Sequence, residues 1–182
     1  YESLIYSGEF ASPFDIADLA ERTIVTASIS KSHAAPGFRS GWCVGPPWFI
    51  SKAQGVAEAV LFGNQPFIAD MTAHALEHVH DTAEQMGAAY KRRINLLLNA
   101  FEGSNKIQPL KPEAGMFMLL DVSLTDLSGE EFAMQLLDHG VGVMPGYAFG
   151  EQARSFIRLS LTVEDAMLEE AAQRIIKFAE SC

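Results

Sequence analysis

Cysteine is scarce in this chain, with two among 182 residues. Cys43 and Cys182 are too few and too scattered to build a disulfide framework or a zinc site. No apolar run is long enough to span a bilayer, so we expect no membrane helix. The start of the chain shows no signal peptide, although a truncated chain would have lost one, and we expect a cytoplasmic protein.

Basic residues are also in the minority: 13 Lys and Arg residues stand against 23 Asp and Glu residues, for a net charge of -10. Nucleic acids and anionic membranes bind basic surfaces, so neither is expected as a partner. The basic cluster Lys91-Arg92-Arg93 would fan out around a helix and is expected to be solvated. Hydrophobic residues make up 48% of the chain, enough for a sizeable core in one domain or in parts of two.

A lysine at the end of a β-prone run is the most informative residue of the sequence. Lys31 follows closely after the run Thr23-Ile24-Val25-Thr26-Ala27, and Arg39 comes eight positions later. Schiff-base chemistry needs a neutral amine, a form that burial and a nearby cation both favour. Arg39 supplies the cation and a flat fork of donors that matches phosphate oxygens, to which Ser28 and Ser30 can add hydroxyl donors.

The pattern Ser-x-Ser-Lys-x4-Pro-Gly-x-Arg-x-Gly begins at Ser28, and its Pro36-Gly37 predicts a turn that makes the chain double back. This pattern resembles the cofactor segment of fold-type I aminotransferases of class I/II. The resemblance implies that Lys31 is catalytic and forms a Schiff base with pyridoxal 5'-phosphate, while Ser28 and Arg39 hold the phosphate. Ser30 is a further phosphate-binding candidate. The ordinary alternative is a surface lysine after a strand, with an arginine paired elsewhere.

Three segments nearer the end of the chain carry the same resemblance. Glu113-Ala114-Gly115-Met116-Phe117 is similar to the small-domain strand that enters these active sites, and Gly140-Val141-Gly142-Val143-Met144-Pro145-Gly146 is similar to the turn that follows it. Phe156-Ile157-Arg158-Leu159-Ser160-Leu161 resembles the strand whose arginine binds the substrate α-carboxylate, which implies that role for Arg158. A guanidinium suits it, because it can bind a carboxylate through two hydrogen bonds. The alternative is an ordinary strand arginine that points to solvent, opposite its apolar neighbours.

The opening Tyr1-Glu2-Ser3-Leu4-Ile5-Tyr6 resembles the segment that starts at the family tyrosine. In the family this tyrosine binds the phenolic oxygen of the cofactor, so the resemblance adds Tyr1 to the cofactor-binding residues. The family aspartate that pairs with the pyridine nitrogen, and the glycine-rich phosphate loop upstream, are absent. The chain is therefore identified as the C-terminal half of an aminotransferase. We expect it to be inactive alone and to form a homodimer in its full-length parent.

The resemblance also implies the fold, an α/β architecture that is the C-terminal part of a PLP-dependent transferase. Residues 1–85 are expected to end the large PLP-binding domain with a remnant of its sheet, and residues 86–182 to form a linking helix and a compact α/β small domain. The strand near Thr23 is apolar on both faces and lacks most of its neighbours. We therefore expect residues before about Gly63 to be less ordered or to pair with another chain.

The substrates implied are an α-amino acid and a 2-oxo acid. The segments 63–70, 115–118 and 148–150 are most similar to arginine:pyruvate transaminases, with aspartate-type aminotransferases next. Other pyridoxal enzymes, including β-lyases, share the framework, and Lys31 does not distinguish them. Specificity for the side chain resides largely in the missing half and in a partner subunit.

Two alternatives belong to other functional classes. His74-Ala75-Leu76-Glu77-His78 matches the H-x-x-E-H pattern of zinc hydrolases, with two histidines one turn apart on a predicted helix. Structural histidines at the edge of an apolar stripe explain the same pattern, and no separate third ligand stands out, although His80 and Asp81 are near. We expect no metal. The remaining alternative is a non-catalytic dimerisation or regulatory module with aminotransferase-like sequence.

Periodicity predicts the secondary structure along the chain. The expected strands are 41–44, 116–122, 141–144 and 156–162. The expected helices are one with an apolar stripe over 49–60, one at 67–82, a long one that runs on to about Phe101, and two at 129–139 and 163–180. Ser128 with Glu131 predicts a capping box, and Gly140 suits the position just past that helix. Thr162 with Asp165 resembles another capped start. For the last helix we predict a buried stripe of Val163, Met167, Ala171, Ile175 and Phe178.

Overall fold

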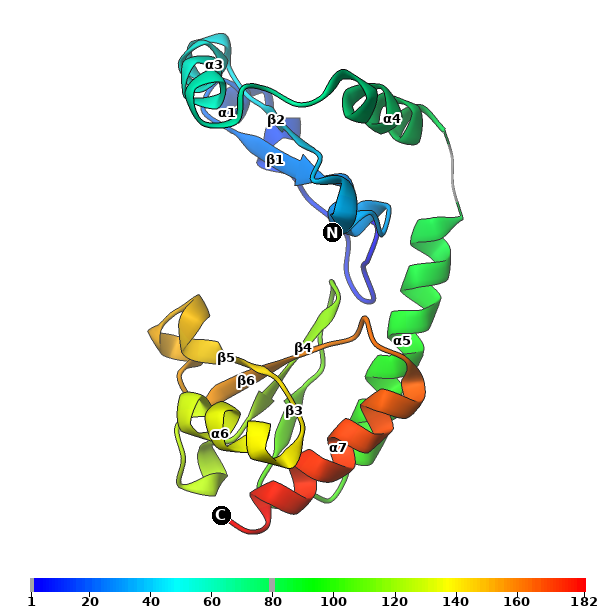
Figure 1. The fold of residues 1–182 in the computed structure, drawn as a ribbon, viewed down its shortest axis with the longest axis vertical. Helices are drawn as coiled ribbons and strands as arrows, with labels where there is room; N and C mark the ends of the chain where they lie inside the picture. The colour runs from blue at the N-terminus through cyan, green and yellow to red at the C-terminus, as the bar shows by residue number, and fades with distance from the viewer. Residues whose placement is uncertain (1, 79–80) are drawn as a thin grey trace. The chain divides into compact units, whose positions relative to one another are not determined.

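The computed structural model of this protein describes residues 2–78 and 81–182. The chain forms two compact units, Tyr1–Gln85 and Met86–Cys182 (Figure 1). Their assignment to the large and small domains stays a prediction. Within the described residues, no helix combines the length and the apolar character that crossing a bilayer requires.

An antiparallel hairpin forms the centre of the first unit. β1 (Val25–Ser28) pairs with β2 (Gly41–Val44), and Ser28 lies opposite Gly41. A Cβ at Gly41 would lie 2.6 Å from the carbonyl oxygen of Ala27, so the strands can approach this closely only at a glycine. The short helix α2 (Ile29–Ser32) and the 3-10 turn η2 (Pro36–Phe38) lie between the strands. The predicted strand at 41–44 and the predicted reversal of the chain are both confirmed.

This unit also contains short and longer helices. The short ones are the 3-10 turn η1 (Pro13–Asp15) and α1 (Ala17–Ala20). The longer ones are α3 (Pro47–Leu61) and α4 (Pro66–Glu77). α3 confirms the predicted helix. The residues of its apolar stripe are not buried: Val56 and Val60 are 65% and 71% exposed, and the neighbouring Leu61 is 68% exposed. The part of the chain that the structure describes leaves this face open to solvent.

The predicted helix at 67–82 ends early. α4 stops at Glu77, and His78 has extended backbone angles, φ -110° and ψ 138°. The next helix, α5, spans Thr82–Ala100 and continues into the second unit.

A four-stranded antiparallel sheet organises the second unit, in the order β3-β4-β6-β5 (Figure 1). Its strands are β3 (Gln108–Leu110), β4 (Phe117–Asp121), β5 (Met144–Pro145) and β6 (Phe156–Ser160). The sequence analysis missed β3, a short edge strand that carries Pro109, and placed β5 too early. Pairing with Arg158 and Ile157 of β6 begins only at Met144.

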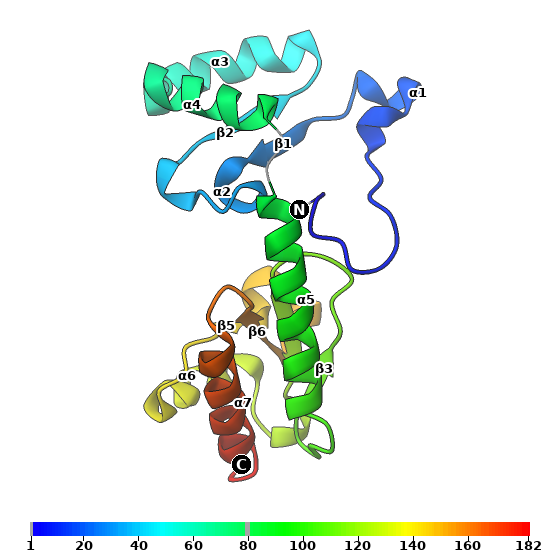
Figure 2. The ribbon, with the colours of Figure 1, turned by 90° about the vertical axis from the view of Figure 1, so that its right-hand side faces the viewer.

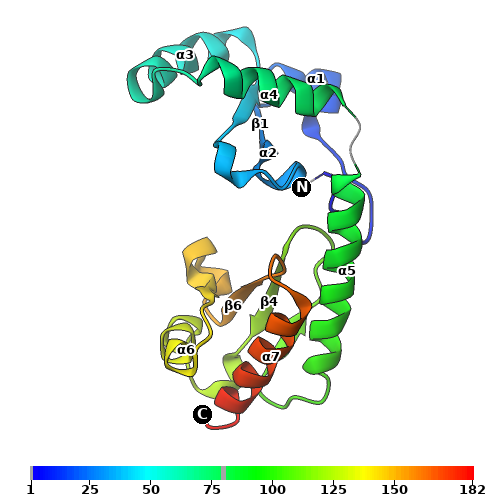
Figure 3. The ribbon, with the colours of Figure 1, turned by 45° about the vertical axis from the view of Figure 1, so that its right-hand side comes forward.

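Helices cover this sheet. They are α6 (Gly129–Leu136) and α7 (Asp165–Ala179), with the 3-10 turns η3 (Ser123–Thr125), η4 (Leu137–His139), η5 (Gly146–Phe149) and η6 (Glu151–Ala153). α5 and α7 lie side by side (Figure 2), whereas α6 packs against β5 and β6 (Figure 3). Alternate residues of the two central strands enter the core between these elements, among them Met118, Leu120 and Ile157.

The buried face of α7 differs from the prediction. Ile175 and Phe178 are buried as expected, but Met167 is 58% exposed while its neighbour Leu168 is 2% exposed. The predicted residues Val163, Met167 and Ala171 instead line a surface groove of about 370 Å³ beside residues 140–143. Apolar residues occupy two adjacent faces of this helix, so periodicity alone did not identify the one that meets the sheet.

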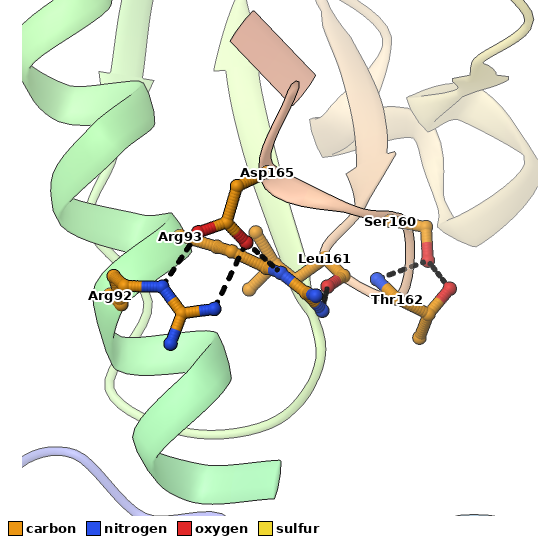
Figure 4. A network of polar contacts seen from close by, with 6 residues as sticks. All are labelled: Arg92, Arg93, Ser160, Leu161, Thr162 and Asp165. Atoms are coloured by element: carbon orange, nitrogen blue, oxygen red, sulfur yellow. Dashed lines mark hydrogen bonds and ion pairs between the residues drawn. The ribbon is translucent and has the colours of Figure 1, made fainter. Parts of the chain in front are cut away.

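Two helix starts test the capping predictions. The box at Ser128 is confirmed: the Glu131 N–H donates to Ser128 Oγ at 3.2 Å, and the Ser128 N–H donates to Glu131 Oε2 at 2.9 Å. The Ser128 hydroxyl, which donates to Glu131 Oε2 at 2.7 Å, and the Ser128 N–H hold the pKa of the Glu131 carboxyl below its usual range. Gly140, at φ 75°, ends η4 as predicted. The cap at Thr162 is wrong, because its hydroxyl contacts Ser160 and the N-cap position belongs to a later residue (Figure 4).

Asp165 serves a different purpose from a cap. Its carboxylate accepts hydrogen bonds from Arg92 Nε at 2.6 Å and from Arg93 Nε at 2.8 Å, and Arg93 Nη1 also donates to the Leu161 carbonyl oxygen (Figure 4). The two guanidinium groups hold the pKa of the Asp165 carboxyl well below its usual range. The basic cluster predicted to be merely solvated therefore ties α5 to the start of α7.

Candidate active site

Lys31 lies in the single helical turn α2 that follows β1, three positions after Ser28, which pairs with Gly41 at the start of β2. A cavity of about 490 Å³ opens at this point and is lined by Glu2, Thr26, Ala27, Ser28 and Lys31. Lys31 is half-buried, and among the described residues its amine has no hydrogen-bond partner. The lysine and the hydroxyl of Ser28 thus share one cavity within the first unit.

The other predicted phosphate ligands lie outside the lining of that cavity. Ser30 is buried, 8% exposed, inside the same helical turn. Arg39 is exposed and left-handed at φ 53°, and its Nη1 donates to the Pro36 carbonyl oxygen at 3.0 Å. That bond occupies one of the five N–H donors of the guanidinium and leaves the others available for an anion. Tyr1 lies outside the described residues.

Buried hydrogen bonds fasten the loop that carries Arg39. Ser40 Oγ lies 2.7 Å from Thr72 Oγ1, and Thr72 Oγ1 donates to the Ile68 carbonyl oxygen at 2.7 Å. Because the Thr72 proton is used there, Ser40 donates to Thr72, and Asn64 Nδ2 donates to Ser40 at 3.4 Å. The sequence analysis missed this chain of hydrogen bonds, which joins residues far apart in the sequence and leaves no local pattern.

A second fastening comes from His33, two positions after Lys31. Its Nε2 donates to the Ala75 carbonyl oxygen in α4 at 3.1 Å, since a carbonyl can only accept. Both ends of the loop from His33 to Ser40 are therefore joined to α4 by side-chain hydrogen bonds. The turn around Lys31 is held in place without using the lysine itself.

Arg158 occupies the middle of β6 in the second unit. Its guanidinium carbon lies 4.0 Å from the ring centroid of Phe117 and 4.2 Å from that of Phe149. A cavity of about 220 Å³ adjoins it, lined by Phe117, Gly142, Val143, Met144, Arg158 and Ser160. Within residues 2–78 and 81–182, Arg158 has neither an ion pair nor a hydrogen bond through its side chain. The solvent-facing alternative is wrong in one respect, because the side chain is half-buried against aromatic rings.

The histidine pair does not have the predicted geometry. His74 lies in α4, but His78 follows the end of that helix, and the two rings stack with centroids 3.9 Å apart. His78 Nδ1 donates to the His74 carbonyl oxygen at 2.7 Å. No group of three His, Cys, Asp or Glu side chains suited to a metal ion occurs among the described residues. His80 lies outside the described residues.

The family known as aminotransferase class I and II matches residues 1–175. This chain belongs to that family. An arginine–pyruvate transaminase of Pseudomonas aeruginosa is 41% identical over 96% of the chain and 45% of the relative. An aspartate aminotransferase of Bacillus sp. is 32% identical over 99% of the chain and 47% of the relative. The chain thus spans about half the length of the curated relatives that it matches.

Solved structures agree with this membership. An aromatic aminotransferase from Pyrococcus horikoshii superimposes with a TM-score of 0.93 at 26% identity, over 100% of this chain and 49% of that one. A double mutant of Thermus thermophilus aspartate aminotransferase gives a TM-score of 0.87 at 29% identity, over 97% and 46%. The expected family and the expected mixed α/β fold class are both confirmed.

Enzymes of this family use pyridoxal 5'-phosphate. The residues around Lys31 fit that group chemically: an amine with no hydrogen-bond partner among the described residues suits an aldehyde, and a hydroxyl and a guanidinium suit a phosphate. The cavity of about 490 Å³ also falls in the size range of small-molecule sites.

Proposed function

We propose that this chain supplies the C-terminal half of an aminotransferase that moves an amino group between an α-amino acid and a 2-oxo acid. The observation that carries the proposal is the shared cavity of Lys31 and Ser28 in a chain of the aminotransferase class I and II family. Without the family, that cavity would indicate only a lysine available for chemistry.

The residues would divide the work as follows. Lys31 would hold the aldehyde end of pyridoxal 5'-phosphate. Ser28 and Arg39 would bind its phosphate, and Ser30 is a further candidate for that contact. Tyr1 would bind its phenolic oxygen. The cofactor, when bound, supplies an electron sink for the substrate α-carbon. The Lys31 amine, once free, would take the proton from that carbon as a base and would then deliver it, as an acid, to the C4' carbon of the cofactor. Its lack of a partner among the described residues leaves it available for this task.

Arg158 would bind the α-carboxylate that every amino acid and 2-oxo acid substrate shares. Two parallel N–H groups of a guanidinium match the two oxygens of a carboxylate, and a half-buried position strengthens the pairing. Its lack of an ion pair among the described residues supports this role, because the charge is not already neutralised by the protein.

Arginine as amino donor and pyruvate as acceptor are the substrates we propose first. The support is the 41% identity to an enzyme with that name. An aspartate-type aminotransferase is the second choice, supported by a relative at 32% identity, and a pyridoxal-dependent β-lyase is the third. We further propose a cytoplasmic homodimer for the full-length protein and no activity for this chain alone.

The decisive experiment uses the longer protein that contains this chain. After incubation with pyridoxal 5'-phosphate and reduction with borohydride, mass spectrometry should locate the label on Lys31. Lys31→Arg should abolish transamination while the fold is retained, because a guanidinium does not act as the base. Lys52→Arg is the matched control, since Lys52 is exposed on α3 and should tolerate the change. A label on another lysine, or an active Lys31→Arg variant, would refute the proposal.

Substrate choice needs a separate measurement. The same protein should be assayed with pyruvate against a panel of amino donors that includes arginine, aspartate and aromatic amino acids. The highest kcat/KM with arginine would support the first choice. A preference for aspartate would move the function to the second choice and leave the roles of Lys31 and Arg158 unchanged.

A further inference from the structure

We propose that Phe117 and Phe149 are positioning residues that hold the guanidinium of Arg158 ready for a carboxylate. The inference deepens the proposed function and rests on the role given there to Arg158. Its basis is the double contact in which the guanidinium carbon lies over both rings, at 4.0 and 4.2 Å from their centroids. Aromatic faces attract a guanidinium, because their quadrupole is negative above the ring.

The sheet explains how Phe117 reaches Arg158. In the β4–β6 pair, Arg158 lies opposite Leu119 and Phe117 lies opposite Ser160. Phe117 is therefore the diagonal neighbour of Arg158 on the same face of the sheet, within reach of a long side chain. Core residues such as Ile157 occupy the other face. Strand register thus fixes one ring beside the guanidinium.

The turn η5 delivers the second ring. At its start, a Cβ on Gly146 would lie 2.2 Å from the Ala153 carbonyl oxygen and 2.7 Å from that of Phe156. Glycine at this position lets the turn pack directly on the beginning of β6. Phe149 lies at the end of the same turn and is 54% exposed. Its ring nevertheless contacts the guanidinium of Arg158 in β6. Because this phenylalanine is largely exposed, its contact with the cation, and not burial in the core, accounts for its position.

This arrangement prepares the guanidinium for binding. An arginine side chain loses rotamer freedom when it binds a ligand, and the two rings impose part of that loss beforehand. The ring contacts are made at the guanidinium carbon, whereas the N–H donors point outward in the plane of the group. With no hydrogen bond to those donors among the described residues, the edges remain available to a planar carboxylate.

Two measurements test the proposal. In the 182-residue chain, NMR should show the Arg158 Hε resonance displaced by ring currents, and the displacement should fall in Phe149→Leu and in Phe117→Leu. In the longer protein, each variant should raise KM for both the amino acid and the 2-oxo acid by about two- to five-fold, with kcat at saturation unchanged. Phe149→Tyr keeps a ring at an exposed site and should restore both signals.

Tyr147→Leu is the matched control, because Tyr147 is exposed in the same turn and is not one of the rings over Arg158. It should leave both measurements at the wild-type value. If Arg158→Leu leaves the KM values unchanged, the proposed carboxylate role fails and this inference fails with it. If Arg158→Leu raises KM strongly but Phe117→Leu and Phe149→Leu behave like wild type, only the positioning role is overturned. An Hε resonance that is unaffected by loss of either ring also overturns it.

Discussion

The two units of this chain differ in how they treat their apolar side chains. Among the described residues, Leu4 and Ile29 are the buried hydrophobic residues of the first unit, and all others of that kind belong to the second. Most large exposed hydrophobic residues lie in the first unit, including Val60 and Leu61 on α3 and Phe62 just past its end. The second unit encloses its own core, whereas the first bears Lys31 on elements whose apolar residues its other described residues leave largely exposed.

The physical consequence concerns stability. Apolar burial is the main favourable term in folding, so a unit with two buried hydrophobic residues gains little free energy from its own packing. On α3, the exposed residues Val56, Val60 and Leu61 line one shallow apolar surface, and contiguous exposed apolar surface is typical of interaction sites. We infer that residues 1–85 rely on protein outside this chain for their full stability, while residues 86–182 do not.

Hydrogen exchange gives the largest expected contrast between the units. Amides of β4 and β6 should exchange only through global unfolding, whereas those of β1 and β2 should exchange through local opening. A difference of about 4 kcal/mol or more in opening free energy corresponds to roughly a thousandfold difference in protection, because 1.4 kcal/mol is tenfold. Uniform protection across residues 1 to 60 and the second unit in a monomer would contradict the comparison.

A matched pair of leucines tests the same contrast by mutation. Leu97 on α5 is 0% exposed, and Leu61 on α3 is 68% exposed. Leu97→Ala should lower the free energy of unfolding by about 2–5 kcal/mol, because it leaves a cavity in the core. Leu61→Ala should change it by about 0.5 kcal/mol or less, because no packing is lost. Urea titrations of both variants, followed by circular dichroism, would measure this; equal losses would show that α3 has a core of its own.

The comparison also explains how much the sequence could predict. Local patterns were reliable: the reversal at Pro36-Gly37 and the capping box at Ser128 need only residues a few positions apart. The helix at 47–61 was found as well, since its period is local. Whether its apolar face is covered depends on residues elsewhere in the protein, so the stripe alone did not indicate that this face would be exposed.

For the candidate site as well, the sequence predicted local features and missed contacts between distant residues. The pattern around Lys31 predicted a lysine and a hydroxyl near each other, and both line one cavity. The hydrogen bond from Ser40 to Thr72 joins residues 32 positions apart. The contact of Phe149 with Arg158 joins the turn η5 to the strand β6. Neither contact leaves a recognisable pattern in the sequence. Such contacts depend on the register of strands and on the packing of helices, which the order of residues does not display.

A helix cap should have a smaller effect, confined to the second unit. Ser128→Ala removes the hydroxyl that accepts the Glu131 N–H and should lower the free energy of unfolding by about 1 kcal/mol. Ser128→Asp keeps a capping oxygen and should restore most of the loss. Thermal unfolding of the three proteins gives the comparison, and an unchanged midpoint for Ser128→Ala would mean that solvent replaces the cap without cost.

The smallest effect should come from Asp165, and it should depend on pH. The pKa of its carboxyl is depressed by Arg92 and Arg93, so it is lower in the folded chain than its ordinary value of 3.8. Its contribution to stability is therefore fully present above that value and is lost as the pH falls through the folded pKa. Asp165→Asn should destabilise the second unit slightly at pH 7, and the gap to wild type should close under strongly acidic conditions. Glu169→Gln, an exposed carboxylate on the same helix, should show no such gap at either pH, and an equal gap for both variants would assign the effect to net charge instead of the ion pair.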